Sequence, residues 1–510
     1  MEPLVLTFDI GTQSARAVLV DDSGILLHKT QKRFDPPYFS LEPGWAEQKA
    51  EYYWDTVCQL SRELQGISGE DWGRIAAVSI TTIRDTNICL DKNGEPIRPV
   101  ILWLDKREAS TRKPLPFPQT AAFSVAGMGE SAKHIRRISV CNWLMQNEPQ
   151  NWEKTDKYMM LSGYMHFCLC GKMIDSAANI IGHVPFDNKK RRWMKKTDLS
   201  YCLFPIPQQK LCELCEPGTI IGGITEKASE LTGIPAGTPL VATGSDKGCE
   251  TIGLSCINPG QAALSFGTTA TIQYTTDRYV EPQQYMPAYV APAAGMWNPE
   301  IEIYRGYWLI SWFTREFAEK EMREAAEKGI APEELLNRRL REIPPGCQGL
   351  MMQPYFTPGV KMPRARGSVI GFSDVHTRIH IYRAIIEGIN FALINGMKSI
   401  EKRIKTPTTA VYLAGGGSQS AEICQITADM FGVPAYRTQT HEAAVIGSSL
   451  LAFRALGRFS SLEEAINSMV HIRDSFQPDM EAHRQYQWLY SNVFTQTYKR
   501  LKPLYEKNYE

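Results

Sequence analysis

Three glycine-containing turns are the parts of this sequence best suited to hold phosphate groups. The first turn is Asp9-Ile10-Gly11-Thr12-Gln13-Ser14, with Arg16 two positions further on. Its backbone N–H groups and the hydroxyls of Thr12 and Ser14 can donate to phosphate oxygens, and Asp9 can hold Mg²⁺ through water. Glycine belongs in such a turn either for a positive φ or for a close approach to the backbone. An ordinary hairpin turn is the alternative interpretation.

Two later turns resemble the first. The second turn is Gly267-Thr268-Thr269, and its glycine stands 256 residues after Gly11. The third turn, Gly415-Gly416-Gly417-Ser418-Gln419-Ser420, lies between a predicted strand and a predicted helix. Its glycines would admit a flat ring or a ribose beside a helix N-terminus, although a plain glycine-rich connection is the alternative. The three turns together favour a nucleotide site, and the absence of a GxxxxGK[ST] motif excludes a P-loop.

Asp246 is the candidate general base. It follows a predicted buried strand at 239–243 and stands between small residues, in Gly244-Ser245-Asp246-Lys247-Gly248. A carboxylate at the end of a strand is well placed to take a proton from a substrate hydroxyl. Asp is also a favoured N-cap residue, and from the local sequence alone the capping role is the favoured interpretation.

Arg84, Asp85 and Trp103 are candidates for contact with an alcohol substrate. Arg84 and Asp85 follow a predicted strand at 78–82, and Trp103 follows one at 100–102, close to Asp105-Lys106-Arg107. A Trp beside charged groups offers a sugar both an apolar face and hydrogen bonds. A core Trp with a surface salt bridge is an equally good interpretation.

Strand and helix patterns alternate along the chain, which predicts an α/β fold. Residues 4–20 and 262–272 each read as a strand, a Gly-Thr turn and a second strand, so we expect two related halves with a β-hairpin at the heart of each. Apolar spacing predicts helices at 379–404 and 421–431. The final stretch, 462–510, is predicted to be helical.

The composition excludes several classes of protein. The chain has 510 residues, of which 43% are hydrophobic and 22% charged, as in ordinary globular proteins of two or three domains. With 56 Lys and Arg against 55 Asp and Glu, nothing supports nucleic-acid binding through bulk charge. The sequence contains no run of about 18 apolar residues, so it predicts no membrane span. The twelve cysteines lack zinc-site spacing and are expected to be free thiols in a reducing cytoplasm.

Taken in order, the motifs resemble those of the FGGY family of carbohydrate kinases, from about residue 4 to residue 460. The matching segments are Phe8-Asp9-Ile10-Gly11-Thr12, Gly44-Trp45-Ala46-Glu47-Gln48, Ile101-Leu102-Trp103-Leu104-Asp105-Lys106-Arg107, Thr243-Gly244-Ser245-Asp246, Ser265-Phe266-Gly267-Thr268-Thr269, Gly367-Ser368-Val369-Ile370-Gly371, Ala414-Gly415-Gly416-Gly417-Ser418 and His441-Glu442-Ala443-Ala444-Val445-Ile446-Gly447.

The resemblance implies two ribonuclease H-like domains of the actin-like ATPase fold with a central cleft. It implies a carbohydrate kinase that uses ATP and Mg²⁺ to phosphorylate a hydroxyl of a small sugar or polyol. We expect an N-terminal domain at 1–245 with the sugar site and first phosphate loop, and a nucleotide-binding C-terminal domain at 246–460. Helices at 461–510 would pack across the junction. A cytoplasmic enzyme without nucleic-acid or membrane partners is expected, and homo-oligomerisation is left open.

Motif matches also imply roles for single residues. Asp246 would be the general base and Asp9 the carboxylate that organises Mg²⁺. The substrate contacts implied are Arg84, Asp85, Trp103 and Asp246. The ATP contacts implied are Thr12, Gln13, Ser14 and Arg16 in the first phosphate loop, Gly267 and Thr268 in the second, Gly306, and Gly416 and Ser420 against the adenosine.

Several segments depart from the well-known members of the family. Residues 81–86 are similar to the Arg-Glu segment of glycerol kinases, whereas xylulokinases carry a Gln-Met-His segment there. Val140 stands in place of a family Lys, and Lys49-Ala50 replace the usual Asp/Asn-Pro. We therefore expect an uncommon subfamily. A glycerol- or tetritol-type kinase is the alternative within the class, and a non-catalytic ATP-binding protein of the same fold is the alternative outside it.

Overall fold

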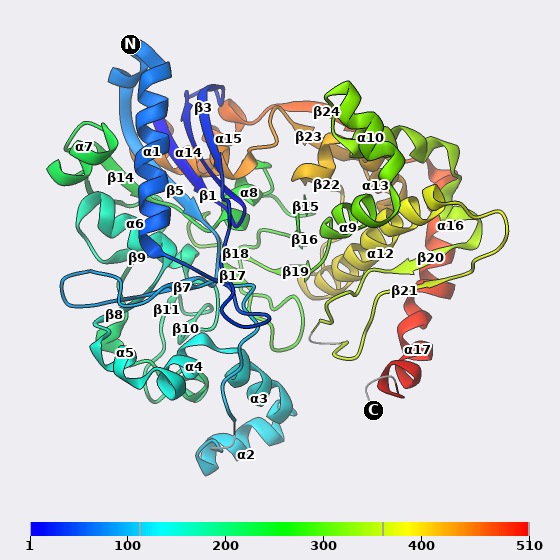
Figure 1. Ribbon diagram of the computed structural model, residues 1–510, viewed down its shortest axis with the longest axis horizontal. Coiled ribbons are helices and arrows are strands. Elements are labelled where there is room, and N and C mark those ends of the chain that lie inside the picture. The colour runs from blue at the N-terminus through cyan, green and yellow to red at the C-terminus, as the bar shows by residue number, and fades with distance from the viewer. Residues whose placement is uncertain (1, 112–113, 360–361, 508–510) are drawn as a thin grey trace. The chain divides into compact units, whose positions relative to one another are not determined.

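The computed structural model describes residues 2–111, 114–359 and 362–507 (Figure 1). The chain forms two compact units, each built around one six-stranded sheet. Unit 1 comprises the residues up to Gly253, Tyr289–Met296 and Ala444–Met469, and unit 2 comprises Leu254–Ala288, Trp297–Ala443 and the residues from Val470 onward. The predicted α/β class is confirmed in both.

The sheet of unit 1 has the strand order β13-β14-β5-β1-β2-β3. Its strands are β1 (Leu4–Ile10), β2 (Ser14–Val20), β3 (Leu26–Arg33), β5 (Ile75–Thr82), β13 (Ile220–Gly223) and β14 (Pro239–Ala242). Strand β1 pairs antiparallel with β2 across the first turn and parallel with β5, which pairs parallel with β14. The predicted hairpin therefore lies inside the sheet, beside its parallel strands.

The sheet of unit 2 has the order β19-β16-β15-β22-β23-β24. Its strands are β15 (Gln261–Phe266), β16 (Ala270–Gln273), β19 (Glu300–Ile303), β22 (Ala410–Ala414), β23 (Ala435–Thr438) and β24 (Ile472–Phe476). From β24 to β19, the succession of parallel and antiparallel pairings is the same as in unit 1 from β13 to β3. This repetition confirms the two related halves predicted from the paired Gly-Thr turns.

The prediction that 462–510 is wholly helical is wrong in one place. Strand β24 lies within that stretch and pairs antiparallel with β23. It is an edge strand with no buried side chain, so its sequence carries no apolar alternation that would identify it. The stretch also contains the helices α15 (Leu462–Met469), α16 (Met480–Leu489) and α17 (Thr495–Lys507).

The remaining elements surround the sheets. In unit 1 they are α1 (Ala50–Ser68), α2 (Phe117–Val125), α3 (Gly129–Ile138), α4 (Val140–Asn147), α5 (Pro149–Lys154), α6 (Leu161–Cys170), α7 (Glu226–Thr232), α8 (Asp246–Gly253), β4 (Glu47–Gln48), β6 (Asn87–Leu90), β7 (Val100–Ile101), β8 (Lys157–Met160), β9 (Ile174–Ser176), β10 (Phe186–Asp187), β11 (Arg192–Trp193), β12 (Glu213–Cys215) and β17 (Tyr289–Val290). In unit 2 they are α9 (Trp308–Phe317), α10 (Glu319–Lys328), α11 (Pro332–Arg338), α12 (Arg378–Ile404), α13 (Ala421–Phe431), β18 (Trp297–Asn298), β20 (Met351–Gln353) and β21 (Ser368–Ile370). Helix α14 (Ala443–Ala455) belongs to unit 1 from Ala444 onward.

The two helices predicted from apolar spacing are confirmed as α12 and α13. Helix α12 packs on β16, β19 and β20, and its buried residues join those of β15 and β22 in the core of unit 2. Helix α13 ends at Gly432, which has a left-handed φ of 70°. None of the described helices has both the length and the apolar character needed to cross a membrane.

The chain passes from unit 1 to unit 2 after Gly253, and it passes between the units again near Ala443 and near Met469. The predicted domain boundaries at 245/246 and 460/461 stay predictions, as does the packing of the final segment across the junction. Residues 1, 112–113, 360–361 and 508–510 of those predicted segments lie outside the described residues.

The sheet of unit 1 is covered on both faces. Leu6 and Phe8 of β1 share an apolar core with residues of α1 and α6. On the opposite face, the Thr7 hydroxyl lies 2.8 Å from that of Ser449 in α14 and 2.8 Å from that of Ser79 in β5. These small, buried hydroxyl residues let α14 lie close to the sheet while every hydroxyl keeps a partner.

Helix α14 also lies unusually close to α8. A Cβ added at Gly447 of α14 would stand 1.9 Å from the carbonyl oxygen of Cys249 in α8. Only glycine fits there, because a backbone oxygen cannot move aside as a flexible side chain can. Helix α8 begins at Asp246, so this contact helps to fix the position of the candidate base.

We predict that Gly447→Ala lowers the free energy of unfolding by about 1–3 kcal/mol, because the added methyl overpacks the α14–α8 contact. The matched control is Gly66→Ala in α1, where nothing lies within 4 Å of an added Cβ. That change should raise stability by about 0.5–1 kcal/mol, since Ala is the better helix former. Denaturant unfolding of both variants measures the difference, and equal effects would contradict the close approach.

Candidate active site

The predicted site residues of unit 1 stand at one edge of its sheet. In the parallel pairs, Asp9 of β1 is in register with Thr81 of β5, and Ala242 of β14 with Ile80. Arg84, Asp85 and Asp246 therefore leave the sheet at the same edge, where β5 and β14 end. The Thr81 hydroxyl donates to the carbonyl of Gly244 at 2.8 Å, which ties the two strand ends together.

Asp246 is the first residue of α8, yet its neighbour supplies the cap. The Ser245 hydroxyl accepts the N–H of Gly248 at 3.3 Å, whereas Asp246 Oδ1 accepts only the N–H of the next residue, Lys247, at 2.7 Å, among backbone donors. The alternative interpretation of Asp246 as the N-cap is thus wrong. Its carboxylate is 26% exposed and lies 3.9 Å from Arg84 Nε.

Arg84 is itself held in place beside Asp246. Its side chain is only 14% exposed, and its guanidinium carbon stands 5.6 Å from the centre of the Tyr289 ring. Stacking on an aromatic ring restrains a guanidinium without using its N–H donors. This cation can therefore be presented to a substrate oxygen at low cost in side-chain entropy.

Asp85 is bound by a residue that the sequence did not identify, His183. Asp85 Oδ1 accepts the backbone N–H of His183 at 3.0 Å, and Oδ2 lies 2.6 Å from the ring nitrogen Nδ1. The Asp85 N–H in turn donates to the carbonyl of Ile181 at 3.0 Å. A Cβ at Gly182 would stand 2.1 Å from Asp85 Oδ1, so the loop requires glycine between the two contacts.

The two partners shift each other's protonation. Burial alone would raise the pKa of Asp85, but the charge and hydrogen bonds of His183 bring it below its usual value. Burial would lower the pKa of His183, and the Asp85 carboxylate raises it above its usual value. Both directions favour the ion pair. His183 stands 98 residues from Asp85, and no sequence pattern connects them.

The first turn is compact and carries Trp103 on one side. The N–H of Gly11 donates to the carbonyl of Ser14 at 2.9 Å. Gly11 has no positive φ. A left-handed backbone is therefore not the reason for glycine here, and close approach to the backbone is the remaining one. Trp103 Nε1–H donates to the Thr12 hydroxyl at 3.0 Å, which places this predicted substrate residue against the predicted phosphate turn. Gln13 is exposed.

Arg16 joins the first turn to the strand before it. Its Nη1 forms a 3.0 Å ion pair with Asp9 Oδ2, and its Nη2 donates to the Ser14 hydroxyl at 3.2 Å. Within the described ranges, no group of three or more His, Cys, Asp or Glu side chains is placed to hold a metal ion. Mg²⁺ commonly uses one or two carboxylates and completes its shell with water and phosphate oxygens, so the Asp9 carboxylate fits it.

The neighbourhood of Trp103 is a buried ionic cluster. Arg107 pairs with Asp105 and Glu47 at 2.8 Å each, and its guanidinium lies over the Trp45 ring at 3.9 Å. All these charges are paired and buried, so the cluster serves to hold the loop that carries Trp103.

In unit 2 the structure brings Gly306 to the second turn. Tyr307 N–H donates to the Gly267 carbonyl at 3.0 Å, and Trp308 N–H to that of Thr268 at 3.4 Å. A Cβ at Gly306 would stand 2.3 Å from the backbone nitrogen of Ala270. Gly306 therefore allows the chain to lie directly against the hairpin, at the start of α9.

The third turn packs on the second in the same unit. Gly415 has a φ of 81°, and a Cβ there would stand 2.7 Å from the carbonyl carbon of Phe266. Gly416, by contrast, has nothing within 4 Å of an added Cβ. Ser420 is the N-cap of α13, and its hydroxyl accepts the N–H of Ile423 at 3.3 Å. Gly416 is thus the position of this turn that faces open space.

One residue behind the third turn was not predicted from the sequence. Arg437 of β23 donates to the carbonyls of Ser418 and Gln419 at 3.0 and 2.8 Å, and it pairs with Asp474 of β24. The Arg437 side chain satisfies these carbonyl oxygens at the end of the turn and so fixes the shape of the turn. A single Arg in a short strand carries no motif by which it could have been found.

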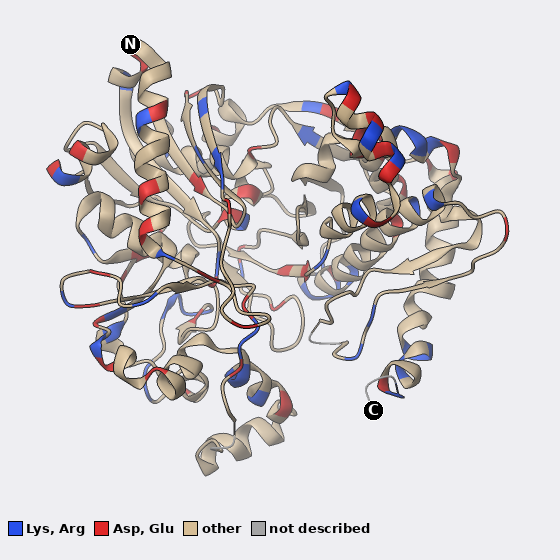
Figure 2. Cartoon of the chain, in the orientation of Figure 1, with Lys and Arg blue, Asp and Glu red and all other residues tan. Residues whose placement is uncertain are grey.

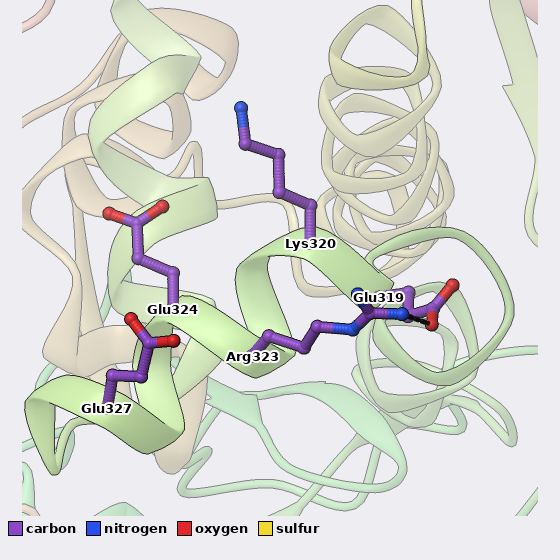
Figure 3. A pocket seen from close by; sticks show the side chains of 5 residues that line it. All are labelled: Glu319, Lys320, Arg323, Glu324 and Glu327. Carbon is purple, nitrogen blue, oxygen red and sulfur yellow. Dashed lines mark hydrogen bonds and ion pairs between the residues drawn. The ribbon is translucent and has the colours of Figure 1, made fainter.

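A hollow of about 320 Å³ on α10 is separate from these groups. It is lined by five charged side chains of that one helix, Glu319, Lys320, Arg323, Glu324 and Glu327 (Figure 3). Charges of both signs are interspersed along α10 (Figure 2). None of the predicted site residues lines it, and alternating surface charges are typical of a solvated helix.

Comparisons with known proteins place both parts of the chain in one family. The N-terminal domain of the FGGY family of carbohydrate kinases matches residues 4–253, and the C-terminal domain of that family matches residues 262–456. An uncharacterised sugar kinase of Escherichia coli (strain K12) is 27% identical over 99% of this chain and 95% of its own length. A xylulose kinase of Lactococcus lactis is 26% identical over 97% of this chain and 96% of its own.

Among solved structures, the gluconate kinase from Lactobacillus acidophilus superposes with a TM-score of 0.83 at 22% identity, covering 99% of this chain and 100% of that one. This likeness shows the fold, the two-domain actin-like ATPase fold predicted above. Because both family domains match and together span most of the sequence, this chain belongs to the FGGY family of carbohydrate kinases, phosphotransferases that use ATP to phosphorylate a sugar or polyol.

Proposed function

We propose that Asp246 is the general base of this kinase and takes the proton from the acceptor hydroxyl. The observation that carries the proposal is that Ser245 caps α8, which leaves the Asp246 carboxylate at the helix start, 3.9 Å from Arg84 Nε. A carboxylate there is available to a hydroxyl, and phosphoryl transfer needs such a positioned base more than covalent chemistry.

The phosphate-side roles follow the same proposal. Asp9 would hold Mg²⁺, which neutralises charge on the phosphates, and Arg16 beside it would add a positive charge. The donors to phosphate oxygens would be Thr12, Gln13 and Ser14 of the first turn and Gly267 and Thr268 of the second. Gly306 would contact the nucleotide, and Gly416 and Ser420 would face the adenosine part of ATP. The contacts that support these assignments are the packing of Gly306 and of the third turn on the second.

The acceptor would be a small sugar or polyol held by Arg84, Asp85 and Trp103. Relatives of this chain are named for xylulose, gluconate and glycerol, and the Arg84-Asp85 pair favours a second candidate, a glycerol- or tetritol-type polyol. A cytoplasmic location and homo-oligomerisation stay predictions.

The experiment that tests this function is ADP release from Mg-ATP over a panel of ketoses, aldoses, polyols and sugar acids. We expect strong stimulation by one small class of acceptors. No stimulation by any acceptor, together with normal ATP binding, would favour the alternative of a non-catalytic ATP-binding protein.

Asp246→Asn should lower kcat by about 10²- to 10⁴-fold, because this is the contribution of a positioned general base and the amide cannot take a proton. ATP affinity should change little. The matched control is Asp55→Asn on the exposed side of α1, which should retain full activity. Steady-state kinetics and nucleotide titration measure both, and near-normal turnover of Asp246→Asn would remove it from the base role.

Gly416→Leu should weaken ATP binding by tenfold or more, since a side chain placed in the open space of the third turn would occupy the adenosine position. The acceptor KM and the thermal midpoint should stay the same. Gly415→Ala is the contrasting variant: its left-handed φ and its contact with Phe266 predict lost stability instead. Unchanged ATP affinity in a folded Gly416→Leu protein would show that Gly416 does not line the nucleotide.

A further inference from the structure

The pairing of Asp85 with His183 fixes the direction of the imidazole ring. Nδ1 points at Asp85 Oδ2 at 2.6 Å, so the other ring nitrogen, Nε2, points away from the carboxylate. Within the part of the chain that the structure describes, Nε2 has no hydrogen-bond partner, and the side chain is 29% exposed. A ring that is anchored at one nitrogen and open at the other is typical of a histidine that contacts a ligand.

The loop that carries His183 runs beside the candidate base. Ser245 N–H donates to the carbonyl of Ala178 at 3.3 Å, and a Cβ at Gly244 would stand 3.4 Å from that of Ala178. Asp85, which holds His183, directly follows Arg84, and Arg84 lies next to Asp246. The two strand ends therefore place His183 among the residues proposed to receive the acceptor.

Few other charged groups face the ring. Asp85 and Arg84 lie at the end of β5, and His134 of α3 is close enough for the charge of His183 to help lower the pKa of His134, although burial is the largest cause of that lowering. Directly after η3 (Leu199–Leu203), the edge of the Phe204 ring faces the imidazole, with the two ring centroids 6.1 Å apart. From α4 the Cys141 thiol lies 3.9 Å from the His183 carbonyl. Asp85 is the only one of these that favours the charged imidazole.

We propose that His183 is a substrate-binding residue of this kinase: its Nε2–H donates to a second hydroxyl of the acceptor, and Asp85 acts through it as a positioning residue. The assignment rests on the proposed function. It defines the acceptor as a sugar or polyol with at least one hydroxyl besides the one that is phosphorylated. Asp85 keeps the ring oriented and charged, and a hydrogen bond from a charged donor is stronger than one from a neutral donor.

The test compares two amide replacements of the same ring. In His183→Asn the amide N–H can still reach Asp85 in place of Nδ1–H, but the outward donor is lost. In His183→Gln the amide extends toward the place of Nε2 and can donate to the acceptor. We expect His183→Asn to raise the acceptor KM about 10- to 100-fold, with the KM for ATP and the thermal midpoint unchanged. His183→Gln should recover part of the loss.

The pH dependence separates a substrate contact from a structural clamp. In the wild type, the acceptor KM should rise as pH increases through the raised pKa of His183, because the charged donor is lost. This rise should be absent in His183→Asn. In Asp85→Asn it should move to lower pH, since the carboxylate that raises the pKa of the ring is gone. NMR titration of the ring should show the same shift of pKa without any turnover.

Failure of the inference is distinguishable from failure of the proposed function. Wild-type protein that phosphorylates no acceptor in the panel would contradict the function itself. An active wild type whose acceptor KM and pH profile are unchanged in folded His183→Asn would overturn the assignment of His183 alone. A large loss of thermal stability in His183→Asn, with normal acceptor KM in the folded fraction, would make the pair a clamp for the loop and would equally overturn it.

Discussion

The parallel pairing of β1, β5 and β14 is the constraint on which the rest of the site depends. Parallel strands deliver their carboxyl ends to one edge of a sheet, and here three segments leave that edge together: the first turn, Arg84-Asp85 and Asp246. Small residues maintain the arrangement. The hydroxyls of Thr7 and Ser79 contact serine hydroxyls of α14, and Gly447 of α14 lies against α8. These contacts hold α14 close to the strands β1 and β5.

The second unit uses the same sheet for a different purpose. Its hairpin and parallel strand end in turns of glycine and hydroxyl residues, and neither the second nor the third turn carries a carboxylate. Gly306 and Gly415 pack closely against the second turn, and the position of Gly416 faces open space. One topology thus carries Asp9 and Arg84-Asp85 at the ends of β1 and β5 in one unit, and turns of glycine and hydroxyl residues at the ends of β15 and β22 in the other. This difference is expected if the fold sets positions and the turns set chemistry.

Sequence reasoning succeeded where a single segment carries its own signal. The bounds of α13, the length of α12 and both hairpins follow from apolar spacing and punctuation by glycine. It failed where partners come from distant segments. His183 belongs to Asp85 only through the fold, Arg437 reaches the third turn from another strand, and β24 shows no alternation because it lies at an edge. The local sequence alone favours a capping role for Asp246 because Asp is a good cap, but Ser is a good cap too, and only the hydrogen bonds show that Ser245 is the residue that caps α8.

As a member of its family, this chain transfers the phosphoryl group of ATP to a hydroxyl of a sugar or polyol. The most direct measurement is ³¹P NMR of the products formed from Mg-ATP with a stimulating acceptor. We expect one new phosphomonoester resonance, coupled to protons of the acceptor carbon and equal in amount to the ADP formed. Formation of ADP with inorganic phosphate alone would contradict it, because the phosphoryl group would then have passed to water.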